Sequence, residues 1–278
     1  MTTLPASSHD ALLGLPADPM ERLLAVMARL RDPDGGCPWD LKQDFSSIAK
    51  HTLEEAYEVV DAIEKGDFEG LKEELGDLLL QIVFYAQMAR EEGRFDFAAI
   101  AQGIADKLVR RHPHVFGDET IATAEAMTER WEQDKAKERA AKQTDGAPPS
   151  VLDGVMMALP ALSRTQKIVQ RATRAGFDWE KAEDVFPKLE EEITELKAEI
   201  PSGDRDRLVD ELGDVLFTVV CLANKLKIDP ETALRGANRK FERRFRGMEA
   251  VLSIKNLQTT PISLQEWEQA WIKVKNQE

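Results

Sequence analysis

Hydrophobic residues recur along most of the chain at the spacing of amphipathic helices. One run lies at residues 71–86 and another at residues 208–223, and both follow the i, i+4, i+7, i+8 pattern of a single helical face. A helix start signal agrees with this pattern near the C-terminus, where Ser263 and Glu266 have the spacing of a capping box. The alternating pattern that is typical of half-buried strands is hard to find. The sequence therefore predicts an all-α protein.

The two apolar runs belong to a repeated unit that carries a set of acidic residues. The stretch that begins at Glu54 and ends at Asp77 recurs between Glu191 and Asp214, and each acidic position in the second copy follows its counterpart by 137 residues. The apolar positions keep the same register. We interpret this as an internal duplication of one helical unit.

The segment between the two copies has the composition of a linker. It loses the apolar stripe and ends in a cluster of glycine and proline. We therefore expect a flexible lead-in at residues 1–19, an N-terminal domain at residues 20–135, a linker at residues 136–150 and a C-terminal domain at residues 151–278.

Charge and cysteine content exclude several classes of protein. The 278 residues include 37 basic and 51 acidic side chains, a net charge of −14, which argues against direct nucleic-acid binding. The two cysteines, Cys37 and Cys221, fit no zinc or haem spacing and suggest a reducing compartment. The first 19 residues do not resemble a signal peptide, and no apolar run reaches the roughly 18 residues of a membrane span. We expect a cytoplasmic protein without a membrane partner.

Four acidic residues of the C-terminal copy are expected to converge. At about 100° per residue, Glu192 and Glu195 lie about −60° and about −120° from the apolar stripe of their helix. Glu211 and Asp214 take the same positions on the next helix. The short connection at residues 201–204 makes the two helices antiparallel neighbours, so their acidic flanks meet at the edge of the core.

Four neighbouring carboxylates repel one another, and a divalent cation removes that penalty. Oxygen ligands suit Mg²⁺, with Mn²⁺ as a substitute, and the charge of four acids is compatible with more than one ion. The alternative is a solvated acidic helix face. The pairing of two such flanks, their duplication and a costly mid-helix glycine, Gly213, favour a metal site. The matching N-terminal residues form a possible second metal site: Glu55, Glu58, Glu74 and Asp77.

A di-iron carboxylate bundle is a chemical rival to a magnesium site. That class requires Glu-x-x-His pairs, and none of the four histidines has a glutamate three residues before it. The sequence therefore excludes this rival.

The acidic motifs resemble those of the MazG family of nucleoside triphosphate pyrophosphohydrolases. EExxE followed on the next helix by ExxD is shared with dimeric dUTPases and phosphoribosyl-ATP pyrophosphatases, but further signatures narrow the resemblance. These signatures are Cys37-Pro-Trp-Asp40, Lys107-Leu-Val-Arg-Arg-His-Pro-His-Val-Phe116, Gly176-Phe-Asp-Trp179 and Asn238-Arg-Lys-Phe-Glu-Arg-Arg-Phe245. The resemblance implies two helical-bundle domains in a homodimer. It also implies Mg²⁺-dependent cleavage of NTPs or dNTPs between the α- and β-phosphates by metal-activated water, with a carboxylate such as Glu192 accepting the proton.

A triphosphate also requires fixed cations, and four are expected to serve it. Lys188 and Arg207 lie on the same helix flanks as the acids. Lys240 and Arg244 flank the apolar stripe of a later helix on the corresponding side. The alternative for these residues is an ordinary solvated charged face.

Two further nucleotide-binding residues are expected in the last helix, Trp271 and Lys275. Spacing alone equally fits tryptophans that pin the tail to the core. The resemblance favours nucleotide contact, because the family places an aromatic residue and a lysine of its C-terminal tail at the nucleotide.

The two copies differ in the cations beside their acids. His51 and Gly70 stand where the C-terminal copy has Lys188 and Arg207. We therefore expect residues 151–278 to be the main catalytic unit and residues 20–135 to serve dimer stability or regulation. The alternative function is a non-catalytic nucleotide-sensing or dimerisation module, but the intact acids of both copies favour an enzyme.

Overall fold

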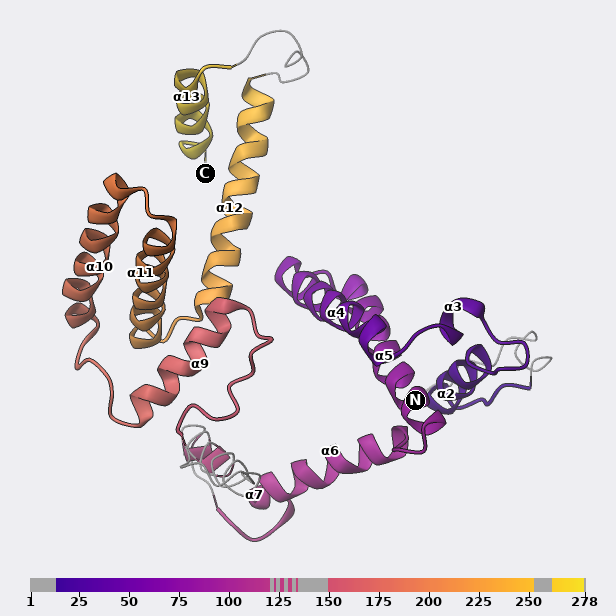
Figure 1. The fold of residues 1–278 in the computed structure, drawn as a ribbon. Coiled ribbons are helices and arrows are strands. Elements are labelled where there is room, and N and C mark those ends of the chain that lie inside the picture. Colours follow the sequence, from indigo (N-terminus) through magenta and orange to yellow (C-terminus); the bar gives the residue numbers. More distant parts are fainter. Residues whose placement is uncertain are drawn as a thin grey trace. The chain divides into compact units, whose positions relative to one another are not determined.

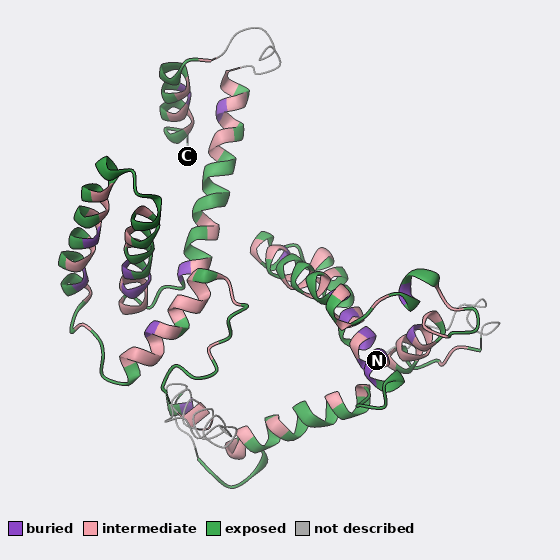
Figure 2. Ribbon diagram, viewed as in Figure 1, coloured by how far each residue is buried: buried purple, intermediate pink, exposed green. Residues whose placement is uncertain are grey.

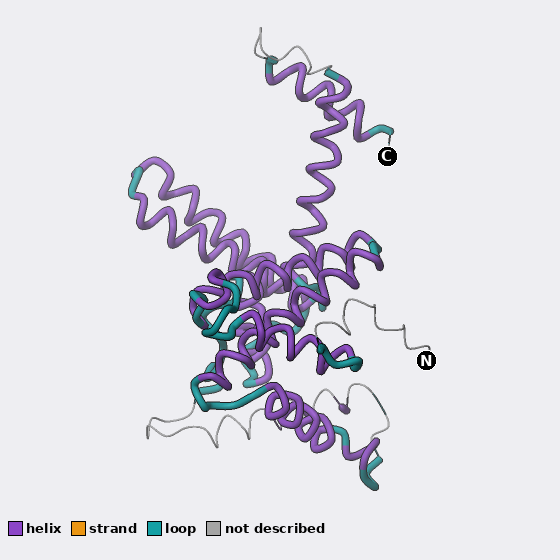
Figure 3. The backbone as a smooth tube through the Cα atoms, turned by 90° about the vertical axis from the view of Figure 1, so that its right-hand side faces the viewer, coloured by secondary structure: helices purple, strands orange, loops and turns teal. Residues whose placement is uncertain are grey.

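The computed structural model describes residues 14–120, 123, 126–127, 130–131, 134, 150–252 and 262–277. Within these residues every regular element is a helix and no strand occurs (Figures 1 and 3), so the all-α prediction is confirmed. The chain divides into two compact units, Met1–Trp131 and Glu132–Glu278. Residues 1–13 of the expected lead-in and residues 136–149 of the expected linker lie outside the described part.

The first unit is built around a pair of long helices, α4 and α5, that pack against each other (Figure 1). Gly66 ends α4 with a φ of 69°, a left-handed conformation that glycine adopts without strain. The Asp67 side chain then caps α5 by accepting a hydrogen bond from the Gly70 amide at 3.0 Å. The helices of this unit are α2 (Pro19–Leu30), α3 (Pro38–Leu41), α4 (Phe45–Lys65), α5 (Phe68–Glu91), α6 (Phe97–Arg111) and α7 (Pro113–Phe116).

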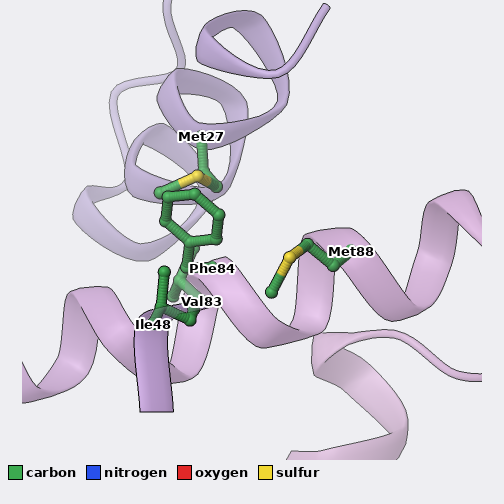
Figure 4. Packing of buried hydrophobic residues seen from close by; sticks show 5 residues of the cluster. All are labelled: Met27, Ile48, Val83, Phe84 and Met88. Carbon is green, nitrogen blue, oxygen red and sulfur yellow. The ribbon is translucent and has the colours of Figure 1, made fainter. Parts of the chain in front are cut away.

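The core of the first unit joins α2, α4 and α5. Met27 of α2 points toward Phe84 of α5, and Ile48 of α4 lies beside Val83 (Figure 4). These side chains and Met88 are almost fully buried. Their burial removes apolar surface from water and holds the three helices together.

The second unit repeats the long helix pair as α10 and α11. Gly203, with a φ of 66°, and Asp204, which caps α11, take the places of Gly66 and Asp67 in the first unit. The capping box expected at Ser263 and Glu266 is confirmed at the start of the last helix. The helical elements of this unit are α9 (Ala161–Arg174), η1 (Ala182–Val185), α10 (Phe186–Glu199), η2 (Ile200–Ser202), α11 (Arg205–Lys225), α12 (Pro230–Val251) and α13 (Leu264–Lys275).

Much of the surface of the long helices is exposed in each unit (Figure 2), and several apolar residues are among the exposed ones. Leu75 of α5 and its counterpart Leu212 of α11 are both 49% exposed, and Leu216 is 51% exposed. The helices of one unit cover only part of the apolar surface that the periodicity creates. None of the helices in the described ranges is long and apolar enough to cross a membrane.

Candidate metal centre

The helix pair of the second unit brings three of the four predicted acids together. Glu192 and Glu195 lie about one turn apart on α10, and Glu211 faces them from α11. One carboxylate oxygen of each lies within 4.8 Å of the others. The antiparallel packing that follows the turn at Gly203 places the two flanks face to face.

The fourth predicted acid, Asp214, lies one turn beyond Glu211 and outside this group of mutually close oxygens. Its side chain is exposed and lines a shallow surface depression along α11 together with Arg207 and Asp210. The Asp214 charge still acts on the cluster, because it contributes to the raised pKa of Glu211. Asp214 therefore stands at the rim of the site.

Mutual repulsion marks the electrostatics of the cluster. Partial desolvation and the neighbouring Glu192 and Glu211 carboxylates raise the pKa of Glu195. Partial desolvation and the surrounding acids, Asp210 first among them, raise the pKa of Glu211. Both shifts show that negative charge is unfavourable at this position.

The two predicted cations nearest the acids form ion pairs. Lys188 Nζ lies 2.8 Å from Glu191 Oε1 and 2.9 Å from Glu192 Oε1. Arg207 donates to Glu199 Oε1 at 3.1 Å. In the structure these cations therefore balance acidic side chains of α10.

The aromatic tail packs against α12. The Arg244 guanidinium lies 5.3 Å from the centre of the Trp271 ring, and Trp267 stacks on Phe245 with 5.2 Å between ring centres. The two tryptophans thus fix α13 to the C-terminal half of α12, which is one of the two roles that their spacing allowed. Lys240 and Lys275 both have exposed side chains.

The first unit contains a second cluster of the same kind. Oxygens of Glu55, Glu58 and Glu74 lie within 4.8 Å of one another. The fourth acid, Asp77, is among the charges that raise the pKa values of Glu55 and Glu74, after partial desolvation. The residue next to this cluster differs, since His51 stands in the position of Lys188 and its Nδ1 lies 2.7 Å from Glu54.

The donor set of both clusters fits a hard divalent cation. Every member is a carboxylate, and histidine and cysteine are absent from these groups of described residues. Oxygen-only ligands suit Mg²⁺ or Mn²⁺ better than zinc. The three carboxylate oxygens lie close together, and the pKa values of Glu195 and Glu211 are raised. A positive ion between these oxygens would therefore reduce their repulsion.

The sequence analysis did not predict that Lys188 and Arg207 form ion pairs with glutamates of α10. The spacing of Lys188 to Glu191 and Glu192 is i,i+3 and i,i+4, which is the signal for ion pairs on one helix. The turn that aligns the helices had a signal as well: Gly66-Asp67 recurs as Gly203-Asp204 at the same 137-residue offset as the acids.

Comparison with known proteins agrees with the duplicated motif. The MazG nucleotide pyrophosphohydrolase domain matches residues 43–116 and again residues 180–247. The chain is 50% identical over 261 residues to the nucleoside triphosphate pyrophosphohydrolase of Escherichia coli K12, covering 93% of this chain and 98% of that protein. It is 40% identical to the nucleoside triphosphate pyrophosphohydrolase/pyrophosphatase MazG of Thermotoga maritima, covering 92% of this chain and 95% of the relative. These matches confirm the resemblance inferred from the motifs, and the chain belongs to the MazG nucleotide pyrophosphohydrolase family.

Proposed function

We propose that the chain is a Mg²⁺-dependent enzyme that hydrolyses nucleoside triphosphates and deoxynucleoside triphosphates between the α- and β-phosphates. The products would be a nucleoside monophosphate and pyrophosphate. The observation that carries this proposal is the convergence of Glu192, Glu195 and Glu211 from two antiparallel helices. The names of the relatives from Escherichia coli and Thermotoga maritima support the same activity.

Glu192, Glu195, Glu211 and Asp214 are the proposed ligands of the cation, with Mn²⁺ as a possible substitute for Mg²⁺. A divalent cation supplies Lewis acidity, neutralises phosphate charge and makes a water molecule more acidic. A carboxylate of the cluster would help to deprotonate the attacking water, and Glu192 is the sequence-based candidate for this role. The water would attack the α-phosphorus in line with the pyrophosphate leaving group.

The triphosphate needs positive charge beyond the cation. Lys240 and Lys275 are exposed and available for this role. Arg244 and Trp271 are proposed to contact the nucleotide from the face that they form together on α12 and α13. Lys188 and Arg207 complete the proposed set, and each would have to exchange a carboxylate partner for a phosphate.

We also propose that the chain forms a homodimer. The long helices leave apolar side chains uncovered at equivalent positions in both units, including Leu75 and Leu212. Exposed apolar residues that recur along one helix face, as Leu212 and Leu216 do, are typical of an interaction site. A second copy, which presents the same faces, would bury it.

Product analysis tests the proposed reaction. The purified chain is incubated with a panel of NTPs and dNTPs in Mg²⁺, and pyrophosphate is separated from orthophosphate. We expect pyrophosphate and the monophosphate in equal amounts, and no turnover with excess EDTA. Orthophosphate and the diphosphate as main products would contradict the proposed bond. Nucleotide binding without any product would favour the non-catalytic sensing module.

A further inference from the structure

Lys188 contacts two acidic side chains at the C-terminal carboxylate cluster. Its ammonium group lies between two glutamates of α10, 2.8 Å from Glu191 and 2.9 Å from Glu192. The Glu191 side chain is 55% exposed, whereas the Glu192 side chain is 7% exposed. The ammonium therefore joins an acid at the surface to the most buried acid of the cluster.

The pairing with Glu192 compensates a charge that burial would otherwise make costly. A carboxylate removed from water loses its hydration and needs a positive partner or several hydrogen bonds. The two remaining cluster residues, Glu195 and Glu211, are acids and supply no positive charge. Lys188 supplies the missing positive charge and also fixes the direction of the Glu192 carboxylate.

The N-terminal cluster does not have this arrangement. His51 occupies the equivalent helix position, and its ring nitrogen contacts Glu54, which corresponds to Glu191. The described contacts of His51 do not include Glu55, the counterpart of Glu192. In the first unit the residue at this position thus pairs with the outer acid, whereas Lys188 reaches both the outer and the inner acid.

The reach of the lysine side chain allows it to release Glu192 without losing its other partner. An ammonium group has three donors on a flexible stem, and Glu191 can keep one of them. A divalent cation that binds Glu192 would compete with Lys188 for this carboxylate, because two positive charges held close together repel each other.

We propose that Lys188 is a positioning residue that serves as the resident counter-charge of the metal-free C-terminal cluster, and that a divalent cation displaces it from Glu192. This inference rests on the proposed metal binding at that cluster. Lys188 stabilises the metal-free helix pair and lowers the affinity of the cluster for cations. Removing the lysine charge should therefore lower the stability of the metal-free protein and raise the affinity of the cluster for cations.

The test compares Lys188→Met with Lys197→Met in the full chain. Lys197 lies nine residues further along α10, about two and a half turns away and on the opposite face, and it is exposed. Both variants remove one positive charge from the same helix. All proteins carry Glu58→Gln, so that Mn²⁺ binding is weakened in the first unit. Mn²⁺ affinity is measured by electron paramagnetic resonance, and the unfolding midpoint is measured in EDTA.

We expect Lys188→Met to bind Mn²⁺ about two- to fivefold more tightly than the parent, the range expected for loss of a partly exposed ion pair. Its unfolding midpoint in EDTA should fall, and Mn²⁺ should raise that midpoint by more than in the parent. Lys197→Met should match the parent in both properties. Lys188→Arg, which keeps the charge, should restore the parent affinity.

Equal Mn²⁺ affinities for Lys188→Met and Lys197→Met, or weaker binding by Lys188→Met, would overturn the role of Lys188. Lys188→Gln provides the same comparison if the methionine variant does not fold. A parent protein that binds no Mn²⁺ would instead refute the proposed metal site itself, so the two failures can be told apart.

Discussion

The two copies of the helical unit bury equivalent core positions, but they differ at positions around the core. Ile48 and Val83 of the first unit correspond, at an offset of 137 residues, to Val185 and Val220 of the second, and all four side chains are almost fully buried. The turns between the long helices also match. Packing constraints have therefore kept both copies in one register.

The two cores have side chains of different size at one equivalent position. Phe84 of the first unit corresponds to Cys221 of the second, and both are 4% exposed. Phe84 packs with Met27 and also receives the Arg31 guanidinium at 5.3 Å from its ring centre. Cys221 packs in a smaller cluster with Val169. The first unit thus buries more apolar surface at this position.

The first long helix also differs between the copies. α4 runs unbroken from Phe45 to Lys65, whereas the second unit has η1 followed by α10. Pro187 accounts for the break, because proline lacks an amide hydrogen and is tolerated only in the first turn of an α-helix. The acids keep their spacing because the break precedes Glu192.

The two clusters have the same types of ligand but different neighbouring residues. Both clusters bring three glutamates within 4.8 Å. The residue next to them differs, since Lys188 contacts Glu192 of its cluster, whereas the described partner of His51 is Glu54, which lies outside the cluster. Differences in cation binding and activity between the copies should therefore follow from these neighbours.

Loss of one carboxylate should reduce activity far more in the C-terminal cluster than in the N-terminal cluster. Glu195→Gln should lower kcat by about 10²- to 10³-fold, because it weakens the electrostatic stabilisation of the transition state. The matched change Glu58→Gln should keep most of the activity. Pyrophosphate release at saturating Mg²⁺ measures both, and circular dichroism checks that the helices are retained. The reverse ranking would assign turnover to the first unit.

A smaller effect is expected on stability at the shared core position. Phe84→Ala should lower the free energy of unfolding of the first unit by about 3 kcal/mol, because it leaves a large cavity. Cys221→Ala removes only a small side chain and should cost the second unit about 1 kcal/mol. Denaturant titration measures both losses. Equal losses would show that the two cores are packed alike.

The smallest expected effect concerns pH. The pKa values of Glu195 and Glu211, like those of Glu55 and Glu74, are raised above the ordinary value of 4.5. The folded chain therefore holds more protons than the unfolded chain just above pH 4.5, so this contribution to metal-free stability decreases as the pH rises through that window.

Cation binding should show the opposite dependence on pH, because protons and Mg²⁺ compete for the same carboxylates. The rise in unfolding midpoint on adding Mg²⁺ should be large at neutral pH and should shrink as the pH falls toward 4.5. The control carries Glu58→Gln and Glu195→Gln together and should show a weak Mg²⁺ effect at every pH. A midpoint shift that is independent of pH would contradict carboxylate ligation.

The helices, their duplication and the convergence of three of the four predicted acids could all be predicted from the sequence. Each follows from local rules: a helical period places Glu192 and Glu195 on one flank, and a short turn forces the next helix to return beside it. The capping box at Ser263 could also be predicted from the sequence. These features depend on backbone geometry, which neighbouring residues largely fix.

The partners that long cations contact on other helices could not be predicted from the sequence. The helical register placed Arg207 and Arg244 beside apolar stripes, but it did not show that Arg207 contacts Glu199 of the neighbouring helix or that Arg244 stacks on Trp271. Lysine and arginine side chains have many rotamers, so several acids, rings or phosphates lie within reach of one backbone position. Their partners are selected by distance and burial in the folded chain, and these depend on how the helices pack.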